Sequence, residues 1–290
     1  MNKPALLLIN RHSRKGHQEE SRVVSELRNL GLDILPITPT RGQSLSDLIR
    51  RYHDQVDRVI IGGGDGTLNA AITGLVETGL PLGILPLGTA NDLARTLKIP
   101  MTLPAACQVA ATGSVRKIDL GWVNGHYFFN VASLGLSVQI TRQLDRGLKR
   151  RWGVIAYAFT AFQVLWQSRP FSAEIHCQDQ SLRSKTIQIA VGNGRYYGGG
   201  MAVAEDATID DQRLDLYSLE IQHWWQMLAL IPDMRRGTHI HWSNVRSLQG
   251  KEFRVVTTSP HWINTDGELT TQTPGHFRLI PQALSVLTPR

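Results

Sequence analysis

The sequence contains only two cysteines among its 290 residues, Cys107 and Cys177. They lie far apart and form no metal-ligand spacing, so we expect reduced thiols and neither a zinc site nor a disulfide framework. Long apolar runs are also missing. The longest candidate, residues 154–166, is shorter than a membrane span and is interrupted by Thr160 and Gln163. The sequence therefore predicts a cytoplasmic protein without a transmembrane helix.

Acidic residues are outnumbered, because 31 lysines and arginines face 24 aspartates and glutamates, for a net charge of +7. An excess of positive charge favours an anionic partner, which could be a nucleotide, a nucleic acid or an anionic membrane. No helix-turn-helix, zinc or RNP signature is visible, and the basic residues are not interleaved with aromatic ones. A nucleic acid is therefore the least favoured of these partners.

The chain is organised around a glycine-rich stretch at residues 61–69, Ile-Gly-Gly-Gly-Asp-Gly-Thr-Leu-Asn. It follows an apolar run typical of a buried strand, residues 56–61, and precedes apolar residues at helical spacing. Four glycines allow positive φ and leave no Cβ in the way of a ligand, so backbone N–H groups can converge on phosphate oxygens where the helix starts. We favour a phosphate site over a tight turn that needs glycine only for its shape.

Neither common phosphate motif fits this stretch, because the Walker pattern needs a Lys-Ser/Thr pair after its last glycine and the dinucleotide fingerprint fails at Thr67. The stretch resembles instead the GGDGT loop of diacylglycerol kinases, sphingosine kinases, NAD kinases and, more distantly, phosphofructokinases. The resemblance implies transfer of phosphate from ATP to a hydroxyl. The residues that it assigns to ATP binding are Gly63, Gly64, Asp65, Gly66, Thr67, Leu68 and Asn69.

A second glycine-bearing turn sharpens this resemblance. Residues 86–94, Pro-Leu-Gly-Thr-Ala-Asn-Asp-Leu-Ala, are similar to the segment that distinguishes lipid kinases from NAD kinases. On both motifs the chain resembles bacterial lipid kinases of the YegS type, in the diacylglycerol kinase catalytic-domain family, over nearly its whole length. Thr89 becomes a nucleotide contact by this resemblance. Ala70 departs from it, since the family commonly has glutamate there, and Asp92 could take over the lost carboxylate's role.

The order of elements predicts the fold class α/β plus mostly β, in two domains. Strands and helices alternate up to about residue 117, with one helix capped by Ser44 or Ser46, which is typical of a doubly wound parallel sheet. From residue 118 to residue 280 short strands broken by turn residues predict an antiparallel, β-sandwich-like domain. By resemblance to the family, residues 281–290 return to the first domain.

Other segments are candidates for the cleft or for a lipid surface. Thr38 follows a strand and is either a base or ribose contact or an ordinary turn hydroxyl. Residues 192–200 carry more glycines than a hairpin needs and are expected to line the cleft between the domains. Residues 137–166 read as a helix whose basic residues either face solvent or meet anionic lipid. Residues 223–231 read as a helix that packs in the core rather than at an interface.

An acidic turn at residues 207–215 is a candidate metal site. Carboxylates and main-chain carbonyls suit a hard divalent cation, and an acidic turn without metal stays open beside that interpretation. The family has a similar loop that holds a structural magnesium ion. The resemblance implies Asp211 as the side-chain ligand and the carbonyls of Thr208 and Arg213 as the others. Gln212 stands where the family usually has glycine.

The segment Asp266-Gly267-Glu268 is similar to the family's L-D-G-E segment. Phosphoryl transfer to an alcohol needs a carboxylate near the attacking hydroxyl and a cation across the phosphates. The resemblance implies Glu268 as the general base and Asp266 as a residue that positions the base or the catalytic metal. Asp65 and Asp92 lie in the two glycine-bearing motifs, and their carboxylates could reach a magnesium ion at the nucleotide.

We therefore expect an ATP- and Mg²⁺-dependent kinase that phosphorylates a lipid hydroxyl, such as that of diacylglycerol or phosphatidylglycerol. Its partners would be a nucleotide and a lipid at an anionic membrane surface, with the protein bound peripherally to the inner face and no nucleic acid. The alternatives are an NAD kinase and a nucleotide-binding sensor without catalysis. The acceptor lipid and the oligomeric state stay open, with a homodimer among the possibilities.

Overall fold

The computed structural model describes residues 3–10, 16–40, 42–143, 168–178, 180–221 and 223–290. Its helices are α1 (Gly16–Asn29), α2 (Leu45–Tyr52), α3 (Asp65–Asn69), α4 (Ile72–Thr78), α5 (Asp92–Thr96), α6 (Leu103–Thr112), α7 (Leu136–Gln143) and α9 (Trp224–Arg236), with short 3₁₀ turns η1 (His53–Gln55) and η2 (Thr238–His241).

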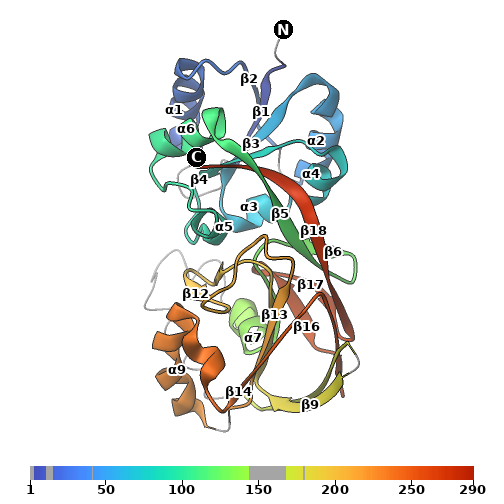
Figure 1. Cartoon of the computed structure of the whole chain (residues 1–290). Coiled ribbons are helices and arrows are strands. Elements are labelled where there is room, and N and C mark those ends of the chain that lie inside the picture. Colours follow the sequence, from blue (N-terminus) through green and yellow to red (C-terminus); the bar gives the residue numbers. More distant parts are fainter. Residues whose placement is uncertain (1–2, 11–15, 41, 144–167, 179, 222) are drawn as a thin grey trace.

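The first part of the chain forms a parallel sheet with helices packed against it, in the upper half of Figure 1. Its strands are β1 (Ala5–Ile9), β2 (Ile34–Ile37), β3 (Arg58–Gly63) and β4 (Leu82–Pro86). They pair in parallel in the order β2-β1-β3-β4. Their apolar residues form one core with those of α1, α2, α4, α5 and α6. The predicted doubly wound α/β arrangement is confirmed.

Two antiparallel layers build the other half of the molecule. One belongs to the ten-stranded sheet and contains β5 (Ser114–Val123), β6 (His126–Phe128), β8 (Phe171–Cys177), β9 (Gln180–Thr186), β15 (Glu252–Thr257) and β18 (Gly275–Thr288). The other is a six-stranded sheet of β14 (Val245–Gly250), β13 (Leu214–Leu219), β10 (Gln188–Gly192), β7 (Val131–Gly135), β16 (Trp262–Thr265) and β17 (Glu268–Gln272). A short hairpin, β11 (Tyr196–Tyr197) and β12 (Met201–Ala202), stands apart.

These two layers enclose an apolar core, as expected for a β-sandwich. Side chains from β5, β6, β8, β15 and β18 meet those of β7, β10, β13 and β16 in it, among them Phe128, Phe253 and Phe277. A further cluster on the six-stranded sheet involves α7 and α9, where Leu230 and Met234 pack near Tyr217. The predicted antiparallel sandwich is confirmed.

Strand β18 crosses from one half of the molecule to the other (Figure 1). It pairs with β15 and β5 along its length, and Val286 pairs in parallel with Leu82 of β4. Its register with β5 shifts between Ile280 and Leu284, where Gln282 has φ of 49°. The apolar patterns at residues 276–280 and 284–287 predict two short strands here, with Pro281 between them. The structure instead has one strand with an irregularity, because β5 pairs with it on both sides of the shift. The domain boundaries at residues 117 and 281 stay a prediction.

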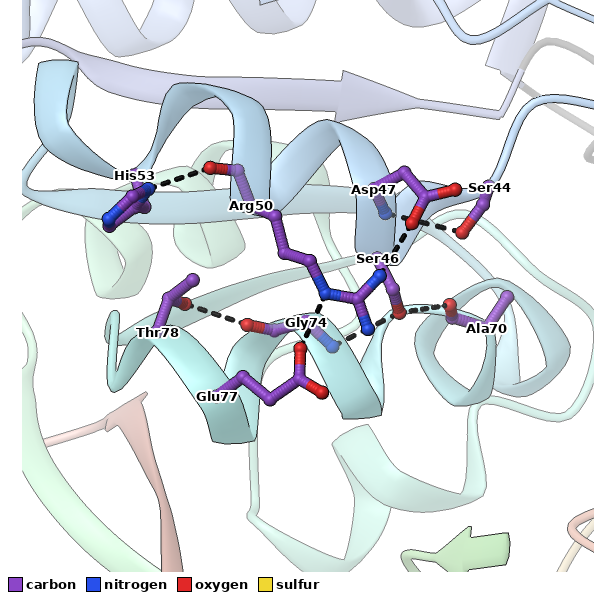
Figure 2. A network of polar contacts seen from close by, with 9 residues as sticks. All are labelled: Ser44, Ser46, Asp47, Arg50, His53, Ala70, Gly74, Glu77 and Thr78. Atoms are coloured by element: carbon purple, nitrogen blue, oxygen red, sulfur yellow. Dashed lines mark hydrogen bonds and ion pairs between the residues drawn. The ribbon is translucent and has the colours of Figure 1, made fainter.

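Helices α2 and α4 lie side by side, and α2 contacts the chain just after the glycine-rich stretch at Ala70 (Figure 2). Ser44 caps α2 by accepting a hydrogen bond from the N–H of Asp47, which is one of the two predicted caps. The helix predicted after the glycines is broken at Ala70 and Ala71 into α3 and α4. The buried Ser46 hydroxyl donates to the carbonyl of Ala70 at 3.0 Å and accepts from the N–H of Gly74 at 3.1 Å.

Candidate active site

The two glycine-bearing turns touch each other at the carboxyl ends of β3 and β4. A Cβ built on Gly88 would lie 2.4 Å from the Cα of Gly64, so neither backbone leaves room for a side chain at this contact. Asn91, in the left-handed conformation at φ 52°, ties the second turn by exchanging two hydrogen bonds with Gly88. The two motifs predicted from the sequence therefore form one site.

The glycine loop is also fixed by contacts from other loops. Asn10, after β1, donates to the Thr67 hydroxyl at 3.0 Å, and Asp65 accepts from the N–H of Leu93 at 3.0 Å. A Cβ on Gly63 would lie 2.6 Å from Thr67. The loop after β1, residues 10–16, follows a strand and by its sequence is either a solvated basic turn or a nucleotide-facing loop; Asn10 reaches the glycine loop. Its residues 11–15 lie outside the described residues, as do residues 144–166 of the predicted basic helix.

Asp92 at the start of α5 is a buried carboxylate with 5% of its surface exposed. Its Oδ2 accepts from the N–H of Gly199 at 2.9 Å, while Oδ1 has no hydrogen-bond partner among the described residues. Burial raises the pKa of Asp92 to about 6, and the charges of Asp65 and Asp266 add to the rise. The contact with Gly199 brings the glycine segment at residues 192–200 next to the second glycine-bearing turn, and its place in a cleft between the domains stays a prediction.

Asp266 joins the β16–β17 turn to two other segments. Its carboxylate accepts from the N–H groups of Phe129 at 2.6 Å, Asn130 at 2.9 Å and Val131 at 3.0 Å. It also accepts from the side-chain amide of Asn69 at 3.1 Å. Burial raises the pKa of Asp266, and the three N–H donors act against that rise. These contacts give Asp266 the geometry of a positioning residue.

Glu268 begins β17 and is exposed. A Cβ built on Gly66 would lie 3.4 Å from its Oε1 atom, which places the carboxylate beside the glycine loop. Among the described residues the Glu268 carboxylate has no hydrogen bonds like those that hold Asp266, two residues earlier, so the two acids of this turn differ in environment. The residue predicted as the base and the loop predicted to hold phosphate lie next to each other.

Three further residues are assigned to ATP binding by the resemblance, namely Thr38, Thr89 and Leu68, and they differ in exposure. Thr38 follows the edge strand β2, is exposed and donates to Glu20 of α1 at 3.2 Å. Thr89 is exposed on the turn closed by Gly88 and Asn91. The Leu68 side chain is buried in the core, and its N–H bonds to the carbonyl of Gly64, so its side chain packs the loop.

The acidic turn is organised around Asp211. Its carboxylate accepts from the N–H groups of Thr208 and Arg213, each at 3.2 Å, and lies 3.3 Å from the Arg213 guanidinium. Gln212 adopts φ of 58°, the left-handed conformation that glycine would adopt without strain. Within the described ranges no cluster of three or more His, Cys, Asp or Glu side chains is placed to hold a metal.

Sequence reasoning missed the buried polar residues that support these loops. Asp119 accepts from the N–H of Gln212 at 2.8 Å and from that of Gln282 at 2.7 Å, so it joins the acidic turn to the irregularity in β18. Asn193 donates to the carbonyls of Asp119 and Phe129. The only sequence signal for such roles is a polar residue inside an otherwise apolar strand, which does not reveal its partners.

The structure joins an α/β half that carries a glycine loop to an antiparallel sandwich that places the Glu268 carboxylate beside that loop, an arrangement suited to a kinase. Comparison with known proteins gives the family. Residues 4–123 match the diacylglycerol kinase catalytic domain, and residues 130–288 match the YegS C-terminal NAD kinase beta sandwich-like domain. The chain therefore belongs to the diacylglycerol kinase family of lipid kinases, as the motifs indicated, and the NAD kinase alternative is not favoured. Kinases of this family use ATP as co-substrate.

Relatives match over most of the chain. A "Probable lipid kinase YegS-like" of Yersinia pestis is 32% identical over 99% of this chain and 97% of its own length. A "Diacylglycerol kinase" of Staphylococcus saprophyticus is 29% identical over 86% of this chain and 82% of its own. A crystal structure of a diacylglycerol kinase from Bacillus anthracis superposes with a TM-score of 0.84, at 23% identity, over 99% of this chain and 97% of that one.

Proposed function

We propose that this kinase transfers the γ-phosphoryl group of ATP to a primary hydroxyl of a membrane lipid where the glycine loop meets the β16–β17 turn. The observation that carries the proposal is the position of Glu268, whose Oε1 lies 3.4 Å from a Cβ built on Gly66. A carboxylate there is within reach of a hydroxyl that attacks a phosphate held by the loop.

In this mechanism each part of the site has one task. The backbone of residues 63–69 cradles the phosphates, and Thr38 and Thr89 contact the nucleoside. Glu268 accepts the proton of the lipid hydroxyl as that oxygen bonds to the γ-phosphorus. The bond from the γ-phosphorus to the bridging oxygen breaks, and ADP leaves with the electron pair. Asp266 holds the turn, so that most of the catalysis comes from positioning and charge.

The acidic residues of this site would suit a magnesium ion. Asp65 and Asp92 would hold an ion at the nucleotide, because a buried Asp92 oxygen has no partner among the described residues and the pKa of that carboxyl is raised to about 6. A bound ion neutralises charge on the phosphates during transfer. The protein's own contribution is to keep these carboxylates beside the loop.

A second magnesium ion, held by Asp211 with the carbonyls of Thr208 and Arg213, is also part of the proposal. The tight turn and the burial that raises the pKa of Asp211 support it. The Arg213 guanidinium competes with it, since Arg213 already pairs with Asp206 at 2.7 Å and with Asp211 at 3.3 Å. The acidic turn is therefore held by the Arg213 ion pairs as well as by the proposed magnesium ion.

The acceptor would be reached at an anionic membrane surface, where the protein binds peripherally. The net charge of +7 supports attraction to anionic lipid. Among the described residues no helix is long and apolar enough to cross a membrane. The name of the Staphylococcus saprophyticus relative makes diacylglycerol the first acceptor to test, followed by phosphatidylglycerol.

The test is transfer of labelled phosphate from ATP to lipids in mixed micelles with magnesium. Glu268→Gln should lower kcat by about 10²- to 10⁴-fold, the usual contribution of a general base, while ATP binding measured by calorimetry stays intact. Glu174→Gln, on β8, is the matched control and should behave as wild type. Equal activity of Glu268→Gln and wild type would remove Glu268 as base. ATP binding without labelling of any lipid would favour the sensor alternative, and labelling of NAD the NAD kinase.

A further inference from the structure

Helix α9 packs against the molecule with one face only. Leu230 and Met234 are buried in the cluster next to the six-stranded sheet, and Met227 packs partly against it. The helix lies on the outside of the molecule, at the lower left of Figure 1. Its other face is therefore open to whatever surrounds the protein.

This open face is apolar. Trp225, Leu228 and Ile231 are 56%, 44% and 42% exposed, and they are three of the five large hydrophobic residues that are exposed in the described part of the chain. Positions three residues apart fall on one side of a helix with 3.6 residues per turn, and the exposed Pro232 and Arg235 fall on that side too. Single exposed apolar side chains are normal, whereas a row of three on one helix indicates a contact surface.

The end of the same face is basic. Arg235 and Arg236 close the helix, and the Arg236 side chain is 74% exposed. The nearest carboxylate, Asp233, is 4.0 Å from Arg236 and is already engaged by Trp242 at 2.9 Å and Thr238 at 3.1 Å. At the other end the exposed His223 ring stacks on Trp225. A row of apolar side chains with arginines beside it is the pattern of a helix that lies in a membrane interface.

We propose that the α9 face, made of Trp225, Leu228, Ile231, Arg235 and Arg236, docks the protein onto an anionic bilayer, with the three apolar side chains inserted among the head groups. The inference rests on the proposed function, since a kinase whose acceptor lies in the bilayer must meet it there. Helix α9 is linked to the candidate active site, because it packs on β12 and the loop between β11 and β12 contains Gly199, which bonds to Asp92.

The test is cosedimentation with phosphatidylglycerol vesicles and with phosphatidylcholine vesicles. Wild type should bind the anionic vesicles preferentially. Leu228→Glu/Ile231→Glu should weaken that binding by about tenfold or more, because two apolar side chains are lost from the interface. Arg235→Glu/Arg236→Glu should weaken it and flatten its dependence on salt. Val115→Glu, which changes a residue 59% exposed at the start of β5, is the matched control and should bind as wild type.

Activity separates docking from catalysis. With a short-chain diacylglycerol dissolved as monomers, both double variants should turn over as wild type, whereas with vesicle substrate they should lose activity in proportion to binding. Wild-type vesicle binding by both double variants would overturn the docking proposal. So would a wild-type dimer, seen by light scattering, that Leu228→Glu/Ile231→Glu splits without changing vesicle binding. An inactive wild type whose binding still depends on α9 would overturn the proposed function and leave docking supported.

Discussion

The amide of Asn69, in the glycine loop, donates a hydrogen bond of 3.1 Å to the carboxylate of Asp266, 197 residues later in the chain. The same carboxylate accepts three backbone N–H groups from residues 129–131. One side chain therefore connects the loop expected to hold phosphate with the turn that carries Glu268. We therefore expect the distance between ATP bound at the glycine loop and the Glu268 carboxylate to depend on this side chain.

Removing this connection should affect activity and stability together. Asp266→Asn should cost about 3 kcal/mol of unfolding free energy, because a charge-assisted acceptor of several N–H groups is lost. It should also lower kcat about 100-fold through displacement of Glu268. Asn69→Ala should have a smaller effect in the same direction. A double-mutant cycle from chemical denaturation and steady-state kinetics checks the contact, and fully additive effects of the two changes would contradict it.

The packing of α2 on α4 should be sensitive to two small residues (Figure 2). Ser46→Ala removes the partner of the buried Gly74 N–H and of the Ala70 carbonyl, so we expect a loss of about 1–3 kcal/mol. Gly74→Ala should be at least as harmful, because its Cβ would lie 2.7 Å from the Ser46 backbone. Arg50→Ala is the control on the same helices, since Arg50 and its partner Glu77 are exposed. Thermal and urea unfolding measure all three, and an undamaged Gly74→Ala would refute the contact.

Buried His239 should make stability depend on pH. Burial lowers its pKa to about 4, and its ring packs edge-on against Tyr217 at 4.8 Å. Between pH 6.5 and 4 the unfolded chain binds a proton that the folded protein does not, so this residue's contribution to stability falls as pH falls, by about 3 kcal/mol over the window.

The measurement for His239 is the difference in unfolding free energy between wild type and His239→Phe at each pH. That difference isolates the histidine from Asp92 and Asp215, whose pKa values, raised to about 6, favour the folded state at low pH. We expect the unfolding free energy of His239→Phe to rise steadily relative to that of wild type as pH falls from 6.5. A difference that stays constant with pH would rule out a buried neutral histidine.

Gln212→Gly should stabilise the acidic turn. Gln212 has φ of 58°, and relief of the left-handed strain should exceed the entropy cost of glycine by about 0.5 kcal/mol. Asn91→Gly is the matched contrast, since Asn91 has φ of 52° but bonds to Gly88 through its side chain and should lose stability. Melting temperatures with magnesium and with chelator give both results. A destabilised Gln212→Gly would mean that the glutamine side chain itself supports the turn.

Features encoded by neighbouring residues could be predicted from the sequence. The strand and the helix start at residues 58–69 are local, because the apolar spacing marks both elements around the glycines. The glycines have no positive φ there, and Gly63 and Gly64 instead leave room for Thr67 and Gly88. The position of both glycine turns on one edge of the sheet also followed, since the carboxyl ends of neighbouring parallel strands meet at one sheet edge, whereas their direct contact did not. The backbone at position 212 is left-handed. The glycine that the family usually has there indicates this conformation, whereas glutamine does not.

Features that depend on distant residues could not be predicted from spacing. Nothing near Asn69 indicates that Asp266 is its partner, and nothing near Gly66 indicates that Glu268 lies beside it. The break between α3 and α4 escaped the helical pattern, because the Ser46 hydroxyl of a different helix takes the Ala70 carbonyl. The helix at residues 223–231 was expected in the core, yet its apolar residues divide between a buried and an exposed face.

Strand β18 also has a consequence for how the protein is made. As the chain leaves the ribosome, β4 is complete long before β18, so one edge of the nucleotide-binding sheet stays without its neighbour until residues 284–288 are synthesised. Leu284 and Val286 belong to the same core as Leu6 and Ile61, and that core is therefore incomplete during translation. The two halves must therefore finish folding together, so a change that destabilises one half destabilises the other. The unpaired edge of β4 is the point at which a nascent chain needs protection.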